Sequence, residues 1–184
     1  MDLYFKAEKS GGGATAFYEE SIWTSFQGSQ KTMTIVGIGS NTATAVGFKI
    51  DKPTRIKSAA FEITSFIAGG GQFAIHNVES GLVTDALYNS GSYTISANGI
   101  YTFTAINLDL QPGIYAYIIQ QNVIQTYRAI SLPDNIFGLL PTMGASAFIS
   151  AKRSTQVGIP DPFPVGQTNY TGNVPLAIFE IEMI

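Results

Sequence analysis

The chain has 184 residues and a formal net charge of −3, and only 12% of its residues are charged. This length suits one domain with a core of its own, and the lack of a basic cluster argues against binding of DNA or RNA. The chain has no cysteine, which excludes disulfides and thiolate chemistry. No apolar run approaches the roughly 18 residues of a membrane-spanning helix, and the first residues lack a signal-peptide pattern, so we expect no membrane insertion.

The low charge predicts association with other subunits. With a mean hydropathy of +0.17, an isolated monomer would expose much uncharged and partly apolar surface. Surfaces of that kind usually mark interaction sites. We therefore expect a homo-oligomer, and a trimer is the favoured state.

Residues 1–30 differ in pattern from the rest of the chain. The glycines Gly11–Gly13 are costly to order, and large apolar side chains, among them Trp23 and Phe26, lie on both sides of this break. We interpret residues 1–30 as an N-terminal arm that anchors the chain to a partner. The alternative is that Trp23 and its neighbours pack beneath the main domain.

From residue 31 onward, apolar and polar residues alternate as in half-buried strands. We expect strands at residues 31–38, 43–50, 55–66, 72–77, 82–89, 93–96, 123–130 and 174–184. Asn98-Gly99 predicts a hairpin with a type I′ turn, because that turn needs positive φ at both central residues. The alternation changes phase between Ala105 and Ile106, which predicts either a β-bulge or a strand that crosses between sheets.

A turn at Gln111-Pro112-Gly113 separates two further strand patterns. Pro112 presets φ for a type II turn, and Gly113 would supply the positive φ that this turn requires. Residues 114–119 read as a strand buried on both faces. Tyr115 can fold back and hydrogen-bond to upstream backbone, as tyrosines do at corners of Greek-key sandwiches, although an ordinary β-turn explains the pattern equally well.

Residues 131–173 are rich in proline and glycine and predict a long loop region, with only residues 145–150 extended. Together with about ten to twelve short strands and almost no helix, they predict one all-β domain over residues 31–184. The expected architecture is a jelly-roll-like antiparallel β-sandwich with a short N-terminal arm.

The residues that could carry out catalysis are sparse. His76 is the only histidine, and in an apolar run it reads as a satisfied residue at a strand edge. Glu180 and Glu182 share one face of the last strand, where a solvated outer face explains them better than an acid–base pair. We expect no enzyme, no metal and no cofactor.

Binding is the remaining class of function. Aromatic side chains outside or at the ends of strands are the better candidates for contacts with a partner or ligand, because tyrosine within a strand is common for structural reasons. The candidate contact residues are Trp23, Phe26, Tyr127, Arg128, Phe163 and Tyr170.

Several motifs resemble β-sandwich modules of tailed-bacteriophage structural proteins, such as tail fibres and head or neck appendages. They are GQFAI at 71–75, LY at 87–88, NGI at 98–100, LDLQPGIY at 108–115, GIPDPF at 158–163 and VPL at 174–176. The chain departs from that pattern at Ala116 and Tyr117, where a Tyr-Trp pair is common. That family shares no catalytic residues.

The resemblance implies a non-enzymatic structural component of a virion, as a capsid decoration or a tail or head appendage subunit. It would be assembled in the host cytoplasm and attached to other virion proteins through residues 1–30. The alternative is a receptor-binding or glycan-binding adhesin module of a phage tail fibre, which would contact a host surface glycan through residues 131–173.

Overall fold

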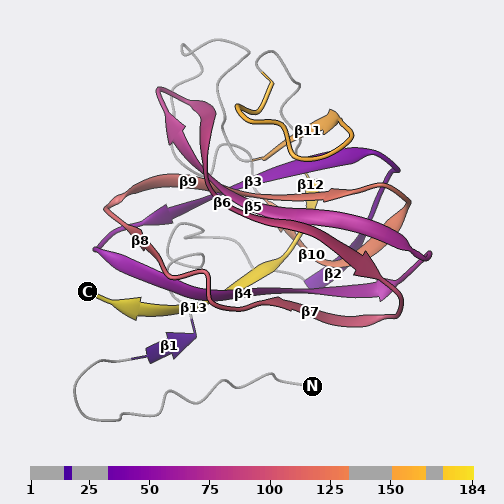
Figure 1. Cartoon of the computed structure of the whole chain (residues 1–184), viewed down its shortest axis with the longest axis horizontal. Coiled ribbons are helices and arrows are strands. Elements are labelled where there is room, and N and C mark those ends of the chain that lie inside the picture. The colour runs from indigo at the N-terminus through magenta and orange to yellow at the C-terminus, as the bar shows by residue number, and fades with distance from the viewer. Residues whose placement is uncertain (1–14, 18–32, 133–150, 165–171) are drawn as a thin grey trace.

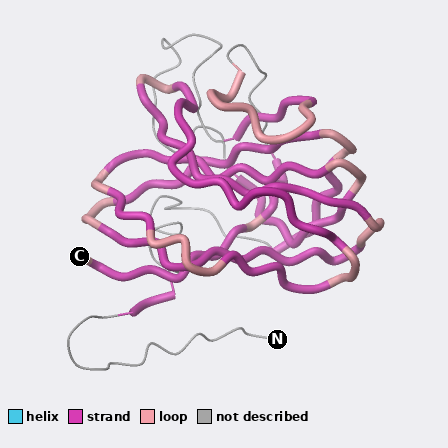
Figure 2. Tube along the Cα trace, in the orientation of Figure 1, coloured by secondary structure: helices cyan, strands magenta, loops and turns pink. Residues whose placement is uncertain are grey.

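A computed structural model describes residues 15–17, 33–132, 151–164 and 172–184 of the chain. The described residues form thirteen β-strands and contain no helix that could span a membrane. The strands make two antiparallel sheets that lie face to face (Figures 1 and 2). The predicted fold class, an all-β antiparallel sandwich, is confirmed.

The two sheets differ in size. The five-stranded sheet has the order β11 (Ala151–Thr155), β3 (Thr42–Ile50), β9 (Gly113–Gln121), β5 (Gly69–Glu79) and β6 (Leu82–Ile95). The eight-stranded sheet has the order β1 (Thr15–Phe17), β13 (Ala177–Met183), β4 (Thr54–Ser65), β10 (Gln125–Leu132) and β12 (Gly172–Pro175). In that sheet β10 also pairs with β2 (Met33–Ile38), and β4 also pairs with β7 (Gly99–Phe103) and β8 (Leu108–Leu110).

The core lies between the sheets and is rich in aromatic rings. Alternation along each strand sends every second side chain inward. The rings of Phe48 on β3 and Phe179 on β13 lie 5.1 Å apart and join the two sheets at one end. Phe61 on β4 and Phe73 on β5, 6.3 Å apart, join them at another place. These contacts bury the apolar face of both sheets, which is the main stabilising term of a sandwich.

Three of the expected strands are divided differently in the structure. The strands expected at 82–89 and 93–96 are one strand, β6, with a bulge in which the amide of Phe73 donates to Ser90 Oγ at 3.0 Å. The last strand is instead two, because the amide of Leu176 donates to the carbonyl of Arg128 and the chain changes its partner from β10 to β4. The strand β11 was not expected, because its sequence AKRST is mostly polar.

The hairpin expected at Asn98-Gly99 is wrong. Strand β6 pairs with β5 and strand β7 pairs with β4, so residues 96–98 carry the chain from one sheet to the other. Gly99 has a φ of 141°, while Asn98 is not among the residues with positive φ. The Tyr101 hydroxyl organises the crossing instead, because it accepts from the amide of Ala97 and donates to the Ala97 carbonyl at 2.9 Å.

The phase change at Ala105 and Ile106 is a bulge. Both β7 and β8 pair with β4, so the alternative of a strand that crosses between sheets is wrong. Between them Ala105 and Asn107 have φ values of 58° and 48°. The amide of Ile106 donates to the carbonyl of Lys57 at 3.0 Å, which keeps the bulged segment on β4.

The central turn is a tyrosine corner. It joins β8 of the eight-stranded sheet to β9 of the five-stranded sheet, and the Tyr115 hydroxyl donates to the carbonyl of Gln111 at 2.9 Å. The expected positive φ at Gly113 is wrong, because Gly113 is not among the positive-φ glycines and pairs as a strand residue with Ile50. A Cβ at Gly113 would lie 3.4 Å from the Tyr115 ring, so the glycine allows the ring to fold back. Residues 115–121 are all buried, as expected for a strand covered on both faces.

Removal of this one hydroxyl should weaken the domain measurably. We expect Tyr115→Phe to lower the free energy of unfolding by about 1 kcal/mol, the usual net value of one intramolecular hydrogen bond. Urea denaturation followed by circular dichroism measures the change. An unaltered midpoint would show that the corner bond contributes nothing to stability.

Candidate functional site

Three of the six expected contact residues lie among the described residues, and they differ in burial. Tyr127 is fully buried in the core, where its hydroxyl donates to Gln121 Oε1, and Phe163 is 2% exposed. Both are therefore corrected from surface contacts to packing residues. Arg128 is half-buried and forms a two-point ion pair with Glu62, at 3.0 and 3.2 Å. Trp23, Phe26 and Tyr170 lie outside the described residues.

His76 is not at a strand edge, contrary to expectation. It lies on β5, which is flanked by β9 and β6, and its side chain is fully buried. Nδ1 lies 2.7 Å from the carbonyl oxygen of Thr84, while Nε2 is buried with no hydrogen-bond partner. Burial lowers the pKa of His76 below the ordinary value. It is therefore only half satisfied.

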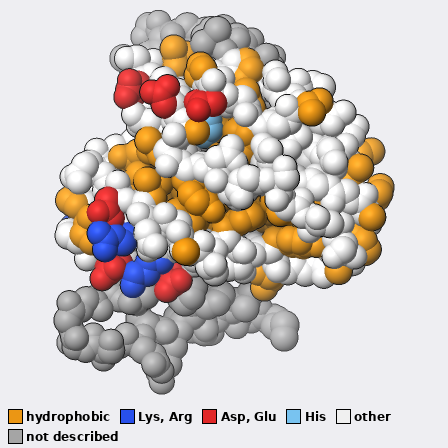
Figure 3. Space-filling view, in the orientation of Figure 1, with side chains coloured by type: hydrophobic (Ala, Val, Ile, Leu, Met, Phe, Trp, Pro, Cys, Tyr) orange, Lys and Arg blue, Asp and Glu red, His pale blue; other side chains and the backbone are white. Residues whose placement is uncertain are grey.

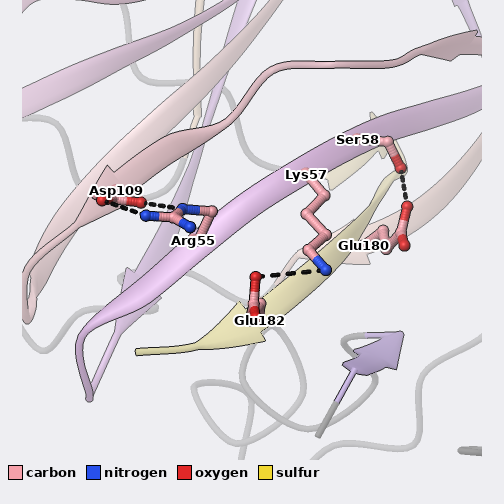
Figure 4. A network of polar contacts seen from close by, with 6 residues as sticks. All are labelled: Arg55, Lys57, Ser58, Asp109, Glu180 and Glu182. Carbon is pink, nitrogen blue, oxygen red and sulfur yellow. Dashed lines mark hydrogen bonds and ion pairs between the residues drawn. The ribbon is translucent and has the colours of Figure 1, made fainter. Parts of the chain in front are cut away.

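The carboxylates of the last strand belong to a polar network on the outer face of the eight-stranded sheet (Figure 4). Ser58 Oγ donates to Glu180 at 2.8 Å, and Lys57 lies 3.3 Å from Glu182. Beside them Arg55 contacts Asp109 at 2.6 Å, and this hydrogen bond lowers the pKa of Asp109. Each carboxylate is thus held by a donor of a neighbouring strand, and exposed pairs of this kind contribute little to stability.

A row of aromatic side chains lies where the two sheets meet at their free margins. Strand β6 ends the five-stranded sheet and β7 borders the eight-stranded sheet, and the two strands are not paired with each other. Tyr88 and Tyr93 of β6 and Tyr101 and Phe103 of β7 are half-buried. We call these four residues the aromatic seam. Figure 3 shows hydrophobic side chains as a band across the middle of this face.

The rings of the seam are held firmly by the core behind them. Phe103 stacks on Phe73 with ring centroids 4.9 Å apart, and Tyr101 stacks on Phe61 at 6.1 Å. Tyr93 meets Phe103 edge-on at 5.3 Å. Since each ring has a partner inside the sandwich, the seam is a preformed surface.

The surroundings of the seam are polar but uncharged. Residues 86–108 contain no Asp, Glu, Lys or Arg. Burial raises the pKa of Tyr88 and of Tyr93, so their hydroxyls remain neutral. Exposed hydroxyl and amide side chains alternate with these rings along the two strands, at Asn89, Ser92, Thr94 and Thr102, and face the outer sides of the sheets. In Figure 3 a mixed group of acidic and basic side chains lies at the lower left of the face, and a second, acidic group lies near its top.

The seam thus combines partly exposed aromatic rings with strand margins that carry no charged side chain between residues 86 and 108. Among the described residues no group of three or more histidine or carboxylate side chains could hold a metal ion. The sequence did contain a signal for the seam, namely three tyrosines within an uncharged stretch. The strand-margin position of these tyrosines, which leaves them partly open, was not readable from that stretch.

Comparison with known proteins gives a likeness of fold. No protein-family model matches the chain, and no curated protein matches it. A crystal structure of the cysteine protease and lectin-like domains of Cwp84, a surface layer associated protein of Clostridium difficile, superposes with a TM-score of 0.52 at 13% identity. A second structure of the same clostridial protease, after propeptide cleavage, gives a TM-score of 0.49 at 15% identity.

The matches cover most of this chain but less than half of each clostridial chain. Each match spans 83% of this chain but only 36% and 40% of the clostridial chains. This chain therefore spans little more than a third of the length of the proteins it matches. At such identities the likeness concerns the fold alone.

Proposed function

We propose that this chain is a non-catalytic recognition module that binds a neutral glycan along the aromatic seam. One observation carries the proposal. Four half-buried rings line the junction of two unpaired strand margins, within a stretch that contains no charged residue.

The chemistry of sugars fits such a surface. The C–H faces of a pyranose pack against flat aromatic rings, while its hydroxyl groups need neutral donors and acceptors nearby. The unpaired backbone N–H and C=O groups along the two strand margins can supply them. Because the rings are already fixed by Phe61 and Phe73, binding would order few side chains and would lose little conformational entropy.

The clostridial neighbour adds support of a second kind. Its structure contains a lectin-like domain beside the cysteine protease. The neighbour's protease is a cysteine protease, whereas the present chain has no cysteine. The likeness thus favours recognition over catalysis.

Truncation of one seam ring tests the proposal. We expect the wild-type chain to bind neutral oligosaccharides on a glycan array, and Tyr88→Ala to weaken that binding about tenfold. Loss of one stacked ring removes about 1.4 kcal/mol, which corresponds to that factor. Tyr88 is the suitable position because its ring contact with Phe73 is the longest of the seam, at 6.4 Å, so the core is disturbed least.

The control is Ile124→Ala, which truncates an exposed apolar side chain between β9 and β10, outside the seam. Calorimetric titration with the best glycan of the array should give the wild-type affinity for this control. The proposal fails if no neutral glycan binds, or if both variants bind as the wild type does.

A structural role in a phage virion is the second candidate. β1 pairs antiparallel with β13 of the same chain and so places a strand from the N-terminal part at the margin of the eight-stranded sheet. An arm that extends a sheet margin is a common means of attachment between subunits. In that role the chain would be an oligomeric subunit of a capsid decoration or of a tail or head appendage, and the absence of glycan binding would favour it.

A further inference from the structure

The segment that follows β11 lies across the outer face of the five-stranded sheet. We call residues 156–164 the strap. The amide of Ile159 donates to Gln72 Oε1 at 2.9 Å, and Asp161 Oδ1 accepts from the amide of Ala86 at 3.0 Å. Phe163 is buried against the sheet. The strap is thus fixed to β5 and β6 at several points.

The face beneath the strap is made of small side chains. Phe163 belongs to a buried cluster, separate from the main core, with Ile118, Val83 and the alanines of β3, β5 and β9 at positions 43, 45, 74 and 116. Alanines allow an irregular segment to approach the sheet closely. The strap therefore buries little apolar area against the sheet, so its docking depends on each of its hydrogen bonds to β5 and β6.

His76 lies on this same face. Ala74, two residues earlier on β5, and Ala116, its cross-strand partner on β9, both belong to the cluster of Phe163. Its partner on the other side is Ala86, whose amide bonds to Asp161 of the strap. His76 therefore lies beneath the strap and beside one of its anchors.

The hydrogen bonds of His76 fix where its proton lies. The carbonyl oxygen of Thr84 can only accept, so Nδ1 carries the hydrogen of the neutral ring. Nε2 then presents a lone pair in a buried position without a partner. A second proton on Nε2 would be a buried N–H donor with no acceptor, which is costly.

We infer that His76 is an acid-sensitive latch, and that protonation of its Nε2 releases residues 156–164 from the outer face of the five-stranded sheet. Release would give the new N–H group water as a partner. This inference concerns a different face from the aromatic seam and does not depend on glycan binding.

The charges around the ring set the direction of the effect. Asp161 of the strap and Asp85 of β6 favour the imidazolium form, while burial opposes it and is the larger influence, so the pKa of docked His76 is lowered. Ala74 and Ala116, the neighbours on β5 and β9, carry no charge. A released His76 would titrate near its ordinary value of about 6.5. Protonation therefore does not weaken docking of the strap above about pH 6.5. Below that pH, the fraction of molecules in which the strap is released rises by up to tenfold per pH unit.

The single histidine allows a direct test in the full chain. Its imidazole signals in NMR give its pKa and its tautomer without any assignment problem. Hydrogen exchange followed by mass spectrometry, from pH 7.5 to 4.5, reports opening of the strap. We expect a lowered pKa, an Nδ1–H tautomer, and exchange in peptides of residues 156–164 that rises below pH 6.5 after correction for the intrinsic rate. Peptides of β4 should not change.

Three variants separate the latch from general acid unfolding. His76→Asn keeps a donor toward Thr84 but cannot titrate here, so its strap exchange should lose the pH dependence. Asp161→Asn keeps the acceptor for the amide of Ala86 and removes a charge that favours the imidazolium, so the pKa of docked His76 should fall. The rise in strap exchange should still begin below pH 6.5 but should continue to lower pH than in the wild type. Asp51→Asn, which alters a surface pair with Lys49, should change neither.

The inference is overturned by any of three results: a pKa of His76 at or above 6.5, strap exchange that does not follow the titration of His76, or opening of the strap and of β4 together. Should His76→Asn fail to fold, the shift expected for Asp161→Asn decides the matter alone.

Discussion

Phe61→Ala is expected to lower the free energy of unfolding by about 3–5 kcal/mol, the range for loss of a buried phenylalanine. Phe61 is 2% exposed and lies on β4 at the centre of the aromatic part of the core. Its ring lies within 6.3 Å of five others, which belong to both sheets: Phe73, Tyr93, Tyr101, Phe103 and Tyr127. Because so many partners are fixed by their own strands, the cavity cannot close by a small movement.

Equilibrium denaturation in urea, followed by circular dichroism, measures this loss. Ile100→Ala is the matched control, since Ile100 is the cross-strand partner of Glu62 on the same strand pair but is 73% exposed. It should change stability by less than about 0.5 kcal/mol. A loss below about 1 kcal/mol for Phe61→Ala would contradict the central place of this ring in the core.

The strands were largely predictable from the sequence, whereas the sheet to which each belongs was not. The alternation at 43–50 and 55–66 correctly predicted β3 and β4, because burial of one face is a local pattern. The pair Asn98-Gly99 is a local signal as well, but β7 pairs with β4 because Tyr101 and Phe103 pack on rings far away in the sequence. Burial of these rings outweighs the turn preference.

The local sequence also does not show why a given position requires glycine. Pro112-Gly113 has the sequence of a type II turn, yet Gly113 is a strand residue that makes room for the Tyr115 ring. A positive φ and a close approach both require glycine. Only the position of the tyrosine hydroxyl on Gln111 shows which of the two applies.

The candidate sites depend even more on distant parts of the chain. Phe163 stands in a proline-rich segment and reads as exposed, but it is buried because alanines of three other strands form a shallow seat for it. Tyr88 and Tyr93 read as ordinary strand residues, but β6 lies at a margin of its sheet, so they are partly open. Position within a sheet, which no single segment encodes, decides both cases.

Gly71→Ala should be strongly destabilising, for a reason that involves the seam directly. Gly71 is buried on β5, paired with Tyr93 on β6 and with Gln121 on β9. A Cβ at this position would lie 2.6 Å from Tyr93 Oη and would also press on the backbone oxygen of Gln120. Either the Tyr93 ring must leave its place or β5 must move away from β9. Overpacking of this kind costs about 1–3 kcal/mol, and we expect the upper end because one of the opposing groups is backbone.

Thermal denaturation gives the measurement, with an expected fall in Tm of about 6–12 °C for a loss of about 3 kcal/mol in a domain of this size. Gly37→Ala is the control, since Gly37 is also a strand glycine but a Cβ there would meet nothing within 4 Å. It should leave Tm unchanged or raise it slightly, because alanine reduces the entropy of the unfolded chain. If Gly71→Ala has the same Tm as the control, the Tyr93 ring can move aside freely. The seam would then not be the rigid surface that its ring contacts imply.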